Sequence, residues 1–332
     1  NNENLIAWHN WGWQNKFTAK QNEYHWQTYK NIFYKILPEA VKTFDPQRTY
    51  WPSSPQSYGD KLPDRKSGDE HDWTIWFGEK DFSAYGENVP RFVSEYGLQS
   101  YPDLETLESL TESKDLKIFS PFLDHRQRSK MNWIEPGFDG NGMILRYINQ
   151  YFPSPRNMED LIYLSQLSHQ LSMKEAIEAH RRNMPWCMGS LYWQLNDCWP
   201  TISWASTDYY GNWKAPHYQA KRSFRNLILI EEYKGNILSL SAVSDFPVDK
   251  SLTLQLHWMS NKGNFEGTSI SKDIVAKANT STLIYQEEII GDPLNYTDMT
   301  LIARLFEKEK LQDEKLISFV RPKGEKLQKP KI

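Results

Sequence analysis

The stretch "RFVSEYGLQSYP", residues 91–102, shows how the N-terminal part of this chain is expected to fold. It begins as a short apolar strand and stops at a carboxylate, Glu95, which an aromatic residue, a glycine and, further on, a proline follow. Glycine and proline are poor residues for the interior of a strand, so the strand is expected to end there. A strand end can aim a side chain at a pocket, which makes Glu95 a candidate for chemistry. An ordinary exposed strand end would have the same pattern.

Strands and helices alternate on both sides of this stretch. Further strands are expected at 48–54, 70–76 and 187–195. Apolar residues recur at helical spacing over 22–44, where Pro38 is well placed to open a new turn. A second helix is expected to begin at the capping residue Asn157 and to run to about Arg182, because leucines recur every third or fourth residue. Strand, helix, strand in series predicts an α/β fold with parallel strands and helices outside.

The pattern changes near residue 226. Seven short runs with partial alternation of apolar and polar residues follow, separated by turns rich in Asp, Asn, Gly and Lys. Seven strands in about a hundred residues is the count of an immunoglobulin-like β-sandwich. Two domains are therefore expected, one over 1–226 and a sandwich with a C-terminal tail over 227–332.

Composition excludes several partners. The chain has 39 Lys and Arg against 42 Asp and Glu, so no basic surface for nucleic acid and no polybasic segment for a membrane is expected. No run approaches the length of a membrane-spanning segment. Cys187 and Cys198 have neither a CxxC nor a metal-binding spacing, and no cofactor is expected. The 14 tryptophans exceed what a core needs, and stacking on rings is one explanation.

Motif searches leave one kind of chemistry. The sequence contains no GxSxG, GxGxxG, GxxxxGK[ST] or HExxH motif. What remains is carboxylates, aromatic residues and strand ends. At the C-terminal ends of parallel barrel strands, that combination favours glycoside hydrolysis, for which two carboxylates suffice. Because 42 acidic residues provide many accidental pairs, spacing alone does not choose the pair.

Six stretches together resemble the beta-mannosidases of glycoside hydrolase family two. They are "NNEN" (1–4), "WHNWGW" (8–13), "GDEHDW" (68–73), "FVSEYGLQSYP" (92–102), "DHRQR" (124–128) and "GSLYWQLNDCWPTISWASTDYYGNWKAPHY" (189–218). The resemblance covers residues 1 to about 226. It implies that this region is the C-terminal half of a (β/α)8 TIM barrel, with the immunoglobulin-like sandwich after it. A family-two beta-galactosidase or beta-glucuronidase stays open as an alternative.

The resemblance also assigns roles to residues. It implies that Glu3 is the acid/base and Glu95 the nucleophile of a double displacement with retention, which releases terminal beta-D-mannose. Asn2 is implied as the partner of the sugar 2-hydroxyl. Trp193, at the end of the eighth barrel strand, is the strongest candidate for an aromatic platform. Four more residues are candidates for substrate contact, although His71 could equally be a structural histidine: Trp11, Trp51, His71 and Trp73.

The chain begins within the acid/base motif of the family. The earlier barrel strands and the N-terminal β domains that the family places before them are therefore expected to lie outside this sequence. The expected partners are a beta-mannoside or mannose-containing oligosaccharide and the missing N-terminal half of the same enzyme. An inactive fragment that only binds carbohydrate stays open. The compartment is not set by the sequence: a bacterial enzyme would be periplasmic or extracellular, and a eukaryotic one lysosomal.

Overall fold

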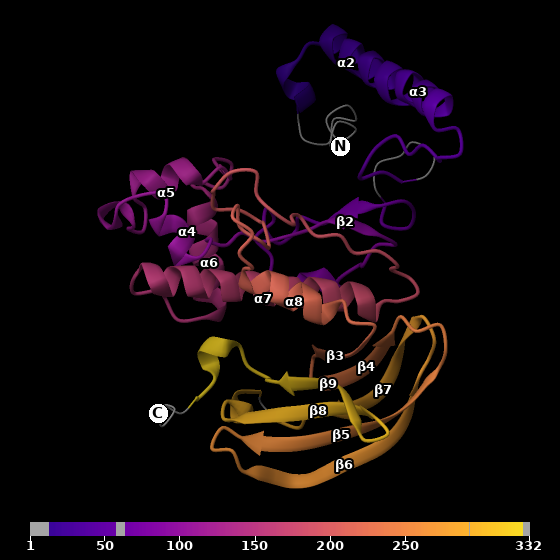
Figure 1. Cartoon of the computed structure of the whole chain (residues 1–332), viewed down its shortest axis with the longest axis vertical. Helices are drawn as coiled ribbons and strands as arrows, with labels where there is room; N and C mark the ends of the chain where they lie inside the picture. Colours follow the sequence, from indigo (N-terminus) through magenta and orange to yellow (C-terminus); the bar gives the residue numbers. More distant parts are fainter. Residues whose placement is uncertain (1–12, 58–63, 292, 328–332) are drawn as a thin grey trace.

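The computed structural model describes residues 13–57, 64–291 and 293–327. Figure 1 shows an N-terminal helical segment, a central part in which helices lie beside short strands, and a C-terminal part made of β-sheets. The central part combines helices with short parallel strands, so the predicted α/β class is confirmed. No helix in the described part of the chain combines the length and the apolar content needed to cross a membrane.

The N-terminal helical segment begins at a capping box. Thr18 and Gln21 exchange hydrogen bonds at the start of α2 (Ala19–Asn31), and a π-helical turn, η2 (Ile32–Ile36), leads into α3 (Leu37–Phe44). Pro38 lies in the first turn of α3, as predicted. Tyr29 is the only buried residue of these three elements, so their apolar residues stay largely exposed in the described structure.

Three of the four predicted strands lie side by side, and they are shorter than predicted. β1 (Glu70–His71) pairs in parallel with β2 (Val93–Glu95), and a single bridge joins Val93 to Ser190 in parallel. Residues 188–193 follow the other side of β2 through four backbone hydrogen bonds: Met188 to Arg91, Val93 to Gly189, Leu191 to Val93, and Trp193 to Tyr96. The chain turns at 74–78, which limits β1 to two residues.

The strand predicted at 48–54 is wrong. These residues are irregular, and just beyond them Gln56 forms an antiparallel bridge with Asp69. Pro52 and Pro55 lack the amide hydrogen that a strand ladder needs, which accounts for the irregular backbone.

Helices cover one side of the short strands. The longest, α7 (Met158–Arg182), starts where the Asn157 side chain accepts a hydrogen bond from the Asp160 amide, and both predicted ends are confirmed. The others are α4 (Leu104–Glu108), α5 (Pro121–Arg126), α6 (Gly140–Tyr151) and α8 (Ala215–Ser223), with short turns η1 (Trp13–Lys16), η3 (Phe82–Gly86) and η4 (Ser113–Asp115). Their shared core is rich in aromatic residues, among them Trp76, Phe82, Tyr85, Tyr96, Tyr101 and Tyr147.

The C-terminal part consists of two antiparallel sheets, and the seven strands predicted after Asn226 are confirmed. One sheet has the order β3-β4-β7, with β3 (Leu227–Lys234), β4 (Ile237–Ser244) and β7 (Thr280–Glu288). The other has the order β6-β5-β8-β9, with β5 (Lys250–Ser260), β6 (Phe265–Ala276), β8 (Met299–Glu307) and β9 (Lys310–Ile317). Two short turns, η5 (Pro293–Tyr296) and η6 (Pro322–Gly324), complete it. Apolar side chains from both sheets form one core, including Leu229, Leu240, Leu254 and Leu305.

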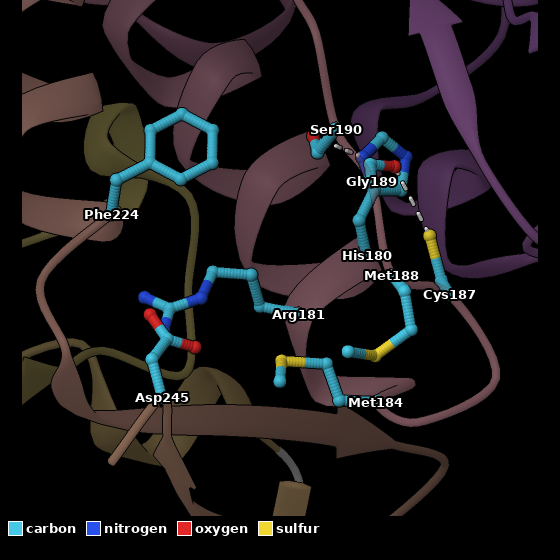
Figure 2. Close-up of a pocket in the computed structure, with 9 residues that line it drawn as sticks. All are labelled: His180, Arg181, Met184, Cys187, Met188, Gly189, Ser190, Phe224 and Asp245. Carbon is cyan, nitrogen blue, oxygen red and sulfur yellow. Dashed lines mark hydrogen bonds and ion pairs between the residues drawn. The ribbon is translucent and has the colours of Figure 1, made fainter. Parts of the chain in front are cut away.

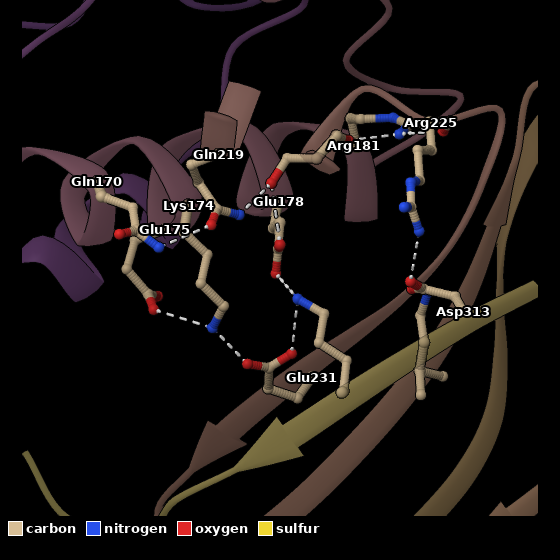
Figure 3. A network of polar contacts seen from close by, with 12 residues as sticks. Gln170, Lys174, Glu175, Glu178, Arg181, Gln219, Arg225, Glu231 and Asp313 are labelled. Atoms are coloured by element: carbon tan, nitrogen blue, oxygen red, sulfur yellow. Dashed lines mark hydrogen bonds and ion pairs between the residues drawn. The ribbon is translucent and has the colours of Figure 1, made fainter. Parts of the chain in front are cut away.

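A largely buried ionic network joins α7 to the β-sheets (Figure 3). Lys174 of α7 binds Glu231 of β3, and Lys315 of β9 lies 3.3 Å from the second oxygen of Glu231. Lys315 also binds Glu178, one helical turn further along α7, at 2.5 Å. Burial alone would raise the pKa of Glu231, but the two ammonium groups lower it. Buried charges are tolerated only when they are paired, so this network holds the helix and the sheets in one arrangement.

We expect Glu231→Gln to lower the free energy of unfolding by about 3–5 kcal/mol, the usual effect of removing one partner from a buried ion pair. The amide would leave two buried ammonium groups short of negative charge. Urea unfolding followed by circular dichroism measures the change. The matched control is Glu314→Gln, which breaks the more exposed pair with Arg304 across β8 and β9. The control should lose less than about 1 kcal/mol. Equal losses in the two variants would show that the network is not stabilising.

Candidate functional site

Glu95 lies at the end of β2, where two other predicted site residues meet it. Its Oε2 accepts a hydrogen bond from Trp73 Nε1 at 3.2 Å and lies 3.3 Å from His71 Nδ1. His71 is the ladder partner of Glu95, and Trp73 follows two residues later, so the pairing of β1 with β2 creates the cluster. The Glu95 side chain keeps 20% of its surface exposed, which leaves it accessible from outside.

Burial sets the protonation of this cluster. It raises the pKa of Glu95, while the Trp73 hydrogen bond acts in the opposite direction by favouring the carboxylate. Burial lowers the pKa of His71 to about 4, although the charge of Asp69 opposes the shift. His71 is therefore neutral at pH 7. Within the described part of the chain, the Glu95 carboxylate is thus held by two uncharged polar groups, the Trp73 indole and the neutral His71 ring.

Hydroxyl groups and a carboxylate support His71 from behind. Its Nε2 lies 3.2 Å from Ser54 Oγ, and Ser54 and Ser94 both donate to Asp69 Oδ2 at 2.5 Å. The histidine thus contacts side chains on both ring nitrogens, a different environment from the backbone carbonyl contact of an ordinary structural histidine. Trp51 lies in the irregular segment that Ser54 ties to β1, and 39% of its surface is exposed.

Trp193 lies beside the Glu95 cluster and has an exposed side chain. Its backbone amide donates to the Tyr96 carbonyl at 2.9 Å, and 44% of its surface is accessible. The carbonyl of Trp193 packs against Gly97, where any Cβ atom would lie only 2.3 Å from that oxygen. Gly97 is thus required for the loop after β2 to pass close to the loop after residue 193.

Trp204 fills the space behind this contact. Its ring lies between Trp73 and Trp76, at centroid distances of 6.1 and 5.8 Å. Trp76 is fully buried, so this side of the cluster is the core of the central part.

Two buried basic residues support the site and were not predicted. Lys214 donates to the carbonyls of Ser100 at 3.0 Å and Ser203 at 3.3 Å, and so joins the loops that follow Glu95 and Trp193. Burial lowers its pKa to about 8, against the charges of Asp197, Asp208 and Asp103. A charged residue inside the stretch 189–218 was the only signal in the sequence that could have found it.

His180, near the end of α7, is the second. Its Nδ1 lies 2.9 Å from Ser190 Oγ, and the same oxygen lies 2.8 Å from the Tyr96 hydroxyl. Burial lowers the pKa of His180 to about 3. The helix is thereby fixed to β2 and to its neighbouring segment.

A separate pocket of about 200 Å³ opens beside His180 (Figure 2). Arg181 and Asp245 form an ion pair at 2.8 Å within it. None of the predicted site residues in the described ranges lines this pocket. In the same ranges, no group of three or more His, Cys, Asp or Glu side chains is arranged to hold a metal ion, and Cys187 and Cys198 are not bonded to each other.

Three predicted site residues, Asn2, Glu3 and Trp11, lie outside the described residues. The structure therefore brings together Glu95, His71 and Trp73, with Trp193 next to them. The distance between Glu3 and Glu95 stays a prediction.

Comparison with known proteins identifies the relatives of the chain. No family model matches it. Mouse beta-mannosidase is 31% identical over 311 residues, which cover 86% of this chain and 34% of the mouse protein. Beta-mannosidase B from Aspergillus terreus is 34% identical over 199 residues, or 58% of this chain and 22% of that protein. The chain is a homologue of the beta-mannosidases.

A solved structure supports this relationship. The beta-D-mannosidase from Dictyoglomus thermophilum matches with a TM-score of 0.80 and 29% identity, over 90% of this chain and 36% of that protein. The resemblance predicted from the motifs is confirmed, and the chain corresponds to a C-terminal part of these beta-mannosidases. It spans about a third of the length of the curated mammalian beta-mannosidases that it matches.

In this beta-mannosidase homologue we expect Gly97→Ala to destabilise the fold by about 1–3 kcal/mol, the range for overpacking. The added methyl group would meet a backbone carbonyl, which cannot rotate away. Urea unfolding gives the free energy, and near-ultraviolet circular dichroism reports the tryptophans. Gly86→Ala is the control, because its Cβ would meet only the end of the Arg182 side chain, at an ordinary contact distance of 3.4 Å. If both variants behave alike, the contact with Trp193 does not set the requirement for glycine.

His180 should make stability depend on pH. In the unfolded chain His180 binds a proton below about pH 6.5, whereas in the folded protein the buried ring binds one only below about pH 3. The free energy of unfolding should therefore fall as the pH is lowered through this window, by up to about 1.4 kcal/mol per pH unit from this residue.

The test compares the wild type with His180→Asn, which keeps a polar group near Ser190 but cannot titrate. Urea unfolding at several values between pH 4.5 and 7 should give a shallower pH dependence for the variant, whatever its absolute stability. The other buried histidines, His71 and His169, are common to both proteins. Parallel curves would contradict the assignment of a low pKa to His180.

Proposed function

We propose that the protein that carries this chain is a retaining, exo-acting beta-mannosidase, which hydrolyses terminal beta-D-mannose residues by double displacement. The observation that carries the proposal is the setting of Glu95, a partly buried carboxylate at a strand end, held by Trp73 and His71. It occurs in a chain whose relatives are named beta-mannosidases. Because the chain spans only part of those relatives, the activity belongs to the complete protein.

The fold proposed for the complete protein is a TIM barrel. In this proposal residues 1–226 are the C-terminal half of the (β/α)8 barrel, and β1, β2 and the segment 188–193 are its sixth, seventh and eighth strands. The parallel hydrogen bonds and the outer helices support this order. Residues 227–332 would be the immunoglobulin-like sandwich with its tail, which the two antiparallel sheets support. The missing barrel half, from the same enzyme, is the expected partner.

Glu95 is the proposed nucleophile. Its carboxylate attacks the anomeric carbon while Glu3 gives a proton to the departing oxygen, and a covalent glycosyl-enzyme ester forms. Glu3 then removes a proton from the water that cleaves the ester, so the configuration is retained. Such enzymes hold the two carboxyl groups roughly 5–5.5 Å apart.

The neighbours of Glu95 suit this role. The Trp73 N–H binds one carboxylate oxygen, Oε2, which restrains the orientation of the carboxylate group. His71 is neutral at pH 7 and orients the carboxylate without neutralising its charge. Burial weakens solvation of Glu95, which makes the carboxylate a better nucleophile.

Substrate contacts are proposed for the remaining predicted residues. Trp193 would form the platform under the mannose ring, since its side chain is exposed and its backbone is fixed to Tyr96, the residue after Glu95. Asn2 would bind the 2-hydroxyl group, and this hydrogen bond would strengthen in an oxocarbenium-like transition state. Trp11 and Trp51 are proposed to shape the surrounding pocket.

In the complete protein, Glu95→Gln should abolish hydrolysis of all beta-mannosides, because no covalent ester can form. Glu3→Gln should lower kcat by roughly 10²–10⁴-fold on sugar leaving groups, yet much less on dinitrophenyl mannoside, whose leaving group needs little protonation. Steady-state kinetics on both substrates measures this difference. Identical losses for both variants on both substrates would contradict the roles.

Steady-state kinetics also identifies which sugar the protein prefers. Wild-type protein is compared on nitrophenyl glycosides of mannose, galactose and glucuronic acid. Preference for mannose supports the proposal, whereas preference for galactose or glucuronic acid would identify another family-two specificity. Binding without turnover of any of the three would identify a protein that only binds carbohydrate.

A further inference from the structure

A row of aromatic side chains leads from Glu95 to the surface. The Trp73 ring, whose N–H binds Glu95, lies 5.3 Å from Phe77 between centroids. Phe77 in turn lies 5.9 Å from Trp133. Exposure rises along the row, from partly buried Trp73 to 37% for Phe77 and 64% for Trp133.

The loop that carries Trp133 is well fixed. Residues 130 and 139 form an antiparallel bridge, reinforced by an ion pair of 3.0 Å between Lys130 and Asp139. Met131 is fully buried, and its amide donates to the Phe138 carbonyl at 2.9 Å. The exposed position of Trp133 is therefore set by the loop structure. A large aromatic ring held open on a fixed loop, in contact with an aromatic row, indicates a binding surface more strongly than an isolated exposed residue does.

Carbohydrate is the ligand that this surface suits. The apolar C–H face of a pyranose ring stacks on an aromatic ring, and the hydroxyl groups at its edge remain in water. Trp133 and Phe77 offer such rings at the outer end of the row, while the inner end contacts the proposed nucleophile. A sugar chain extending away from the cleaved bond would follow this direction.

We propose that Phe77 and Trp133 form an outer platform that binds the leaving-group part of a beta-linked mannose oligosaccharide, beyond the cleaved bond. This inference rests on the proposed function and adds a preference for oligosaccharides over small aryl mannosides. Phe77 and Trp133 bind sugar residues in this assignment and take no part in bond cleavage.

The test is Trp133→Ala in the complete protein. The value of kcat/KM for beta-linked mannotriose should fall roughly threefold to tenfold, the effect of losing one aromatic contact. The loss should lie mainly in KM. For 4-nitrophenyl beta-mannoside, whose small leaving group does not extend to the loop, kcat/KM should change less than about twofold, within the scatter expected for a surface substitution.

Two further variants serve as controls. Trp133→Phe keeps a ring and should retain most of the activity on mannotriose. Tyr163→Ala removes a side chain with 63% exposure on α7 and should leave kcat/KM unchanged for both substrates. Thermal unfolding of each variant confirms that it is folded.

The outcomes separate the two proposals. With an active wild type, an equal loss on both substrates would show that Trp133 only supports the structure or packs against another segment. No loss on mannotriose would equally overturn the platform. A wild-type protein inactive on both mannosides would overturn the proposed function, and the platform with it.

Discussion

The parallel hydrogen bonds on both sides of β2 are the constraint on which the candidate site depends. β1 is bonded to one side and residues 188–193 to the other, so three separate segments of the sequence place their ends together. This pairing brings His71 beside Glu95 and fixes the backbone of Trp193 to Tyr96. Aromatic residues and Gly97 then allow the loops beyond these ends to pack closely. Chemistry at Glu95 thus depends on backbone geometry as much as on the side chains around it.

The interior behind this site contains ionisable groups that other proteins usually keep at the surface. Lys214 binds two backbone carbonyls, and His180 and Tyr96 converge on Ser190. Lys214 joins two loops through their carbonyls, and His180 joins α7 to residues 188–193 through the Ser190 hydroxyl, so these hydrogen bonds offset part of the cost of burial. Their charge states shift accordingly, with the pKa of Lys214 and that of His180 both lowered by burial. Burial of these groups lowers stability, but their hydrogen bonds hold the loops in fixed positions.

Sequence patterns predicted the elements that depend on local signals. Asn157 and the leucine spacing gave both ends of α7, and alternation gave the seven C-terminal strands. The strand at 48–54 failed because Pro52 and Pro55 override the apolar pattern. Glu95, His71 and Trp73 came from motifs, since residues at strand ends are readable once a family resemblance is recognised. Lys214 and His180 were missed because their roles arise from contacts between segments far apart in the sequence, which no local pattern contains.

The ionic network at the base of α7 has a consequence for motion. Lys174, Glu231, Lys315 and Glu178 alternate in sign between the helix and the sheets. Sliding or rotating one part against the other would separate opposite charges in a medium of low dielectric constant, which is costly. Movement of α7 relative to the sheets is thus disfavoured. Any movement that admits a ligand to Glu95 is expected in the loops at the strand ends. The C-terminal sheets hold α7 in a fixed position. Because His180 of α7 binds Ser190, the segment at residues 188–193 is held in place as well.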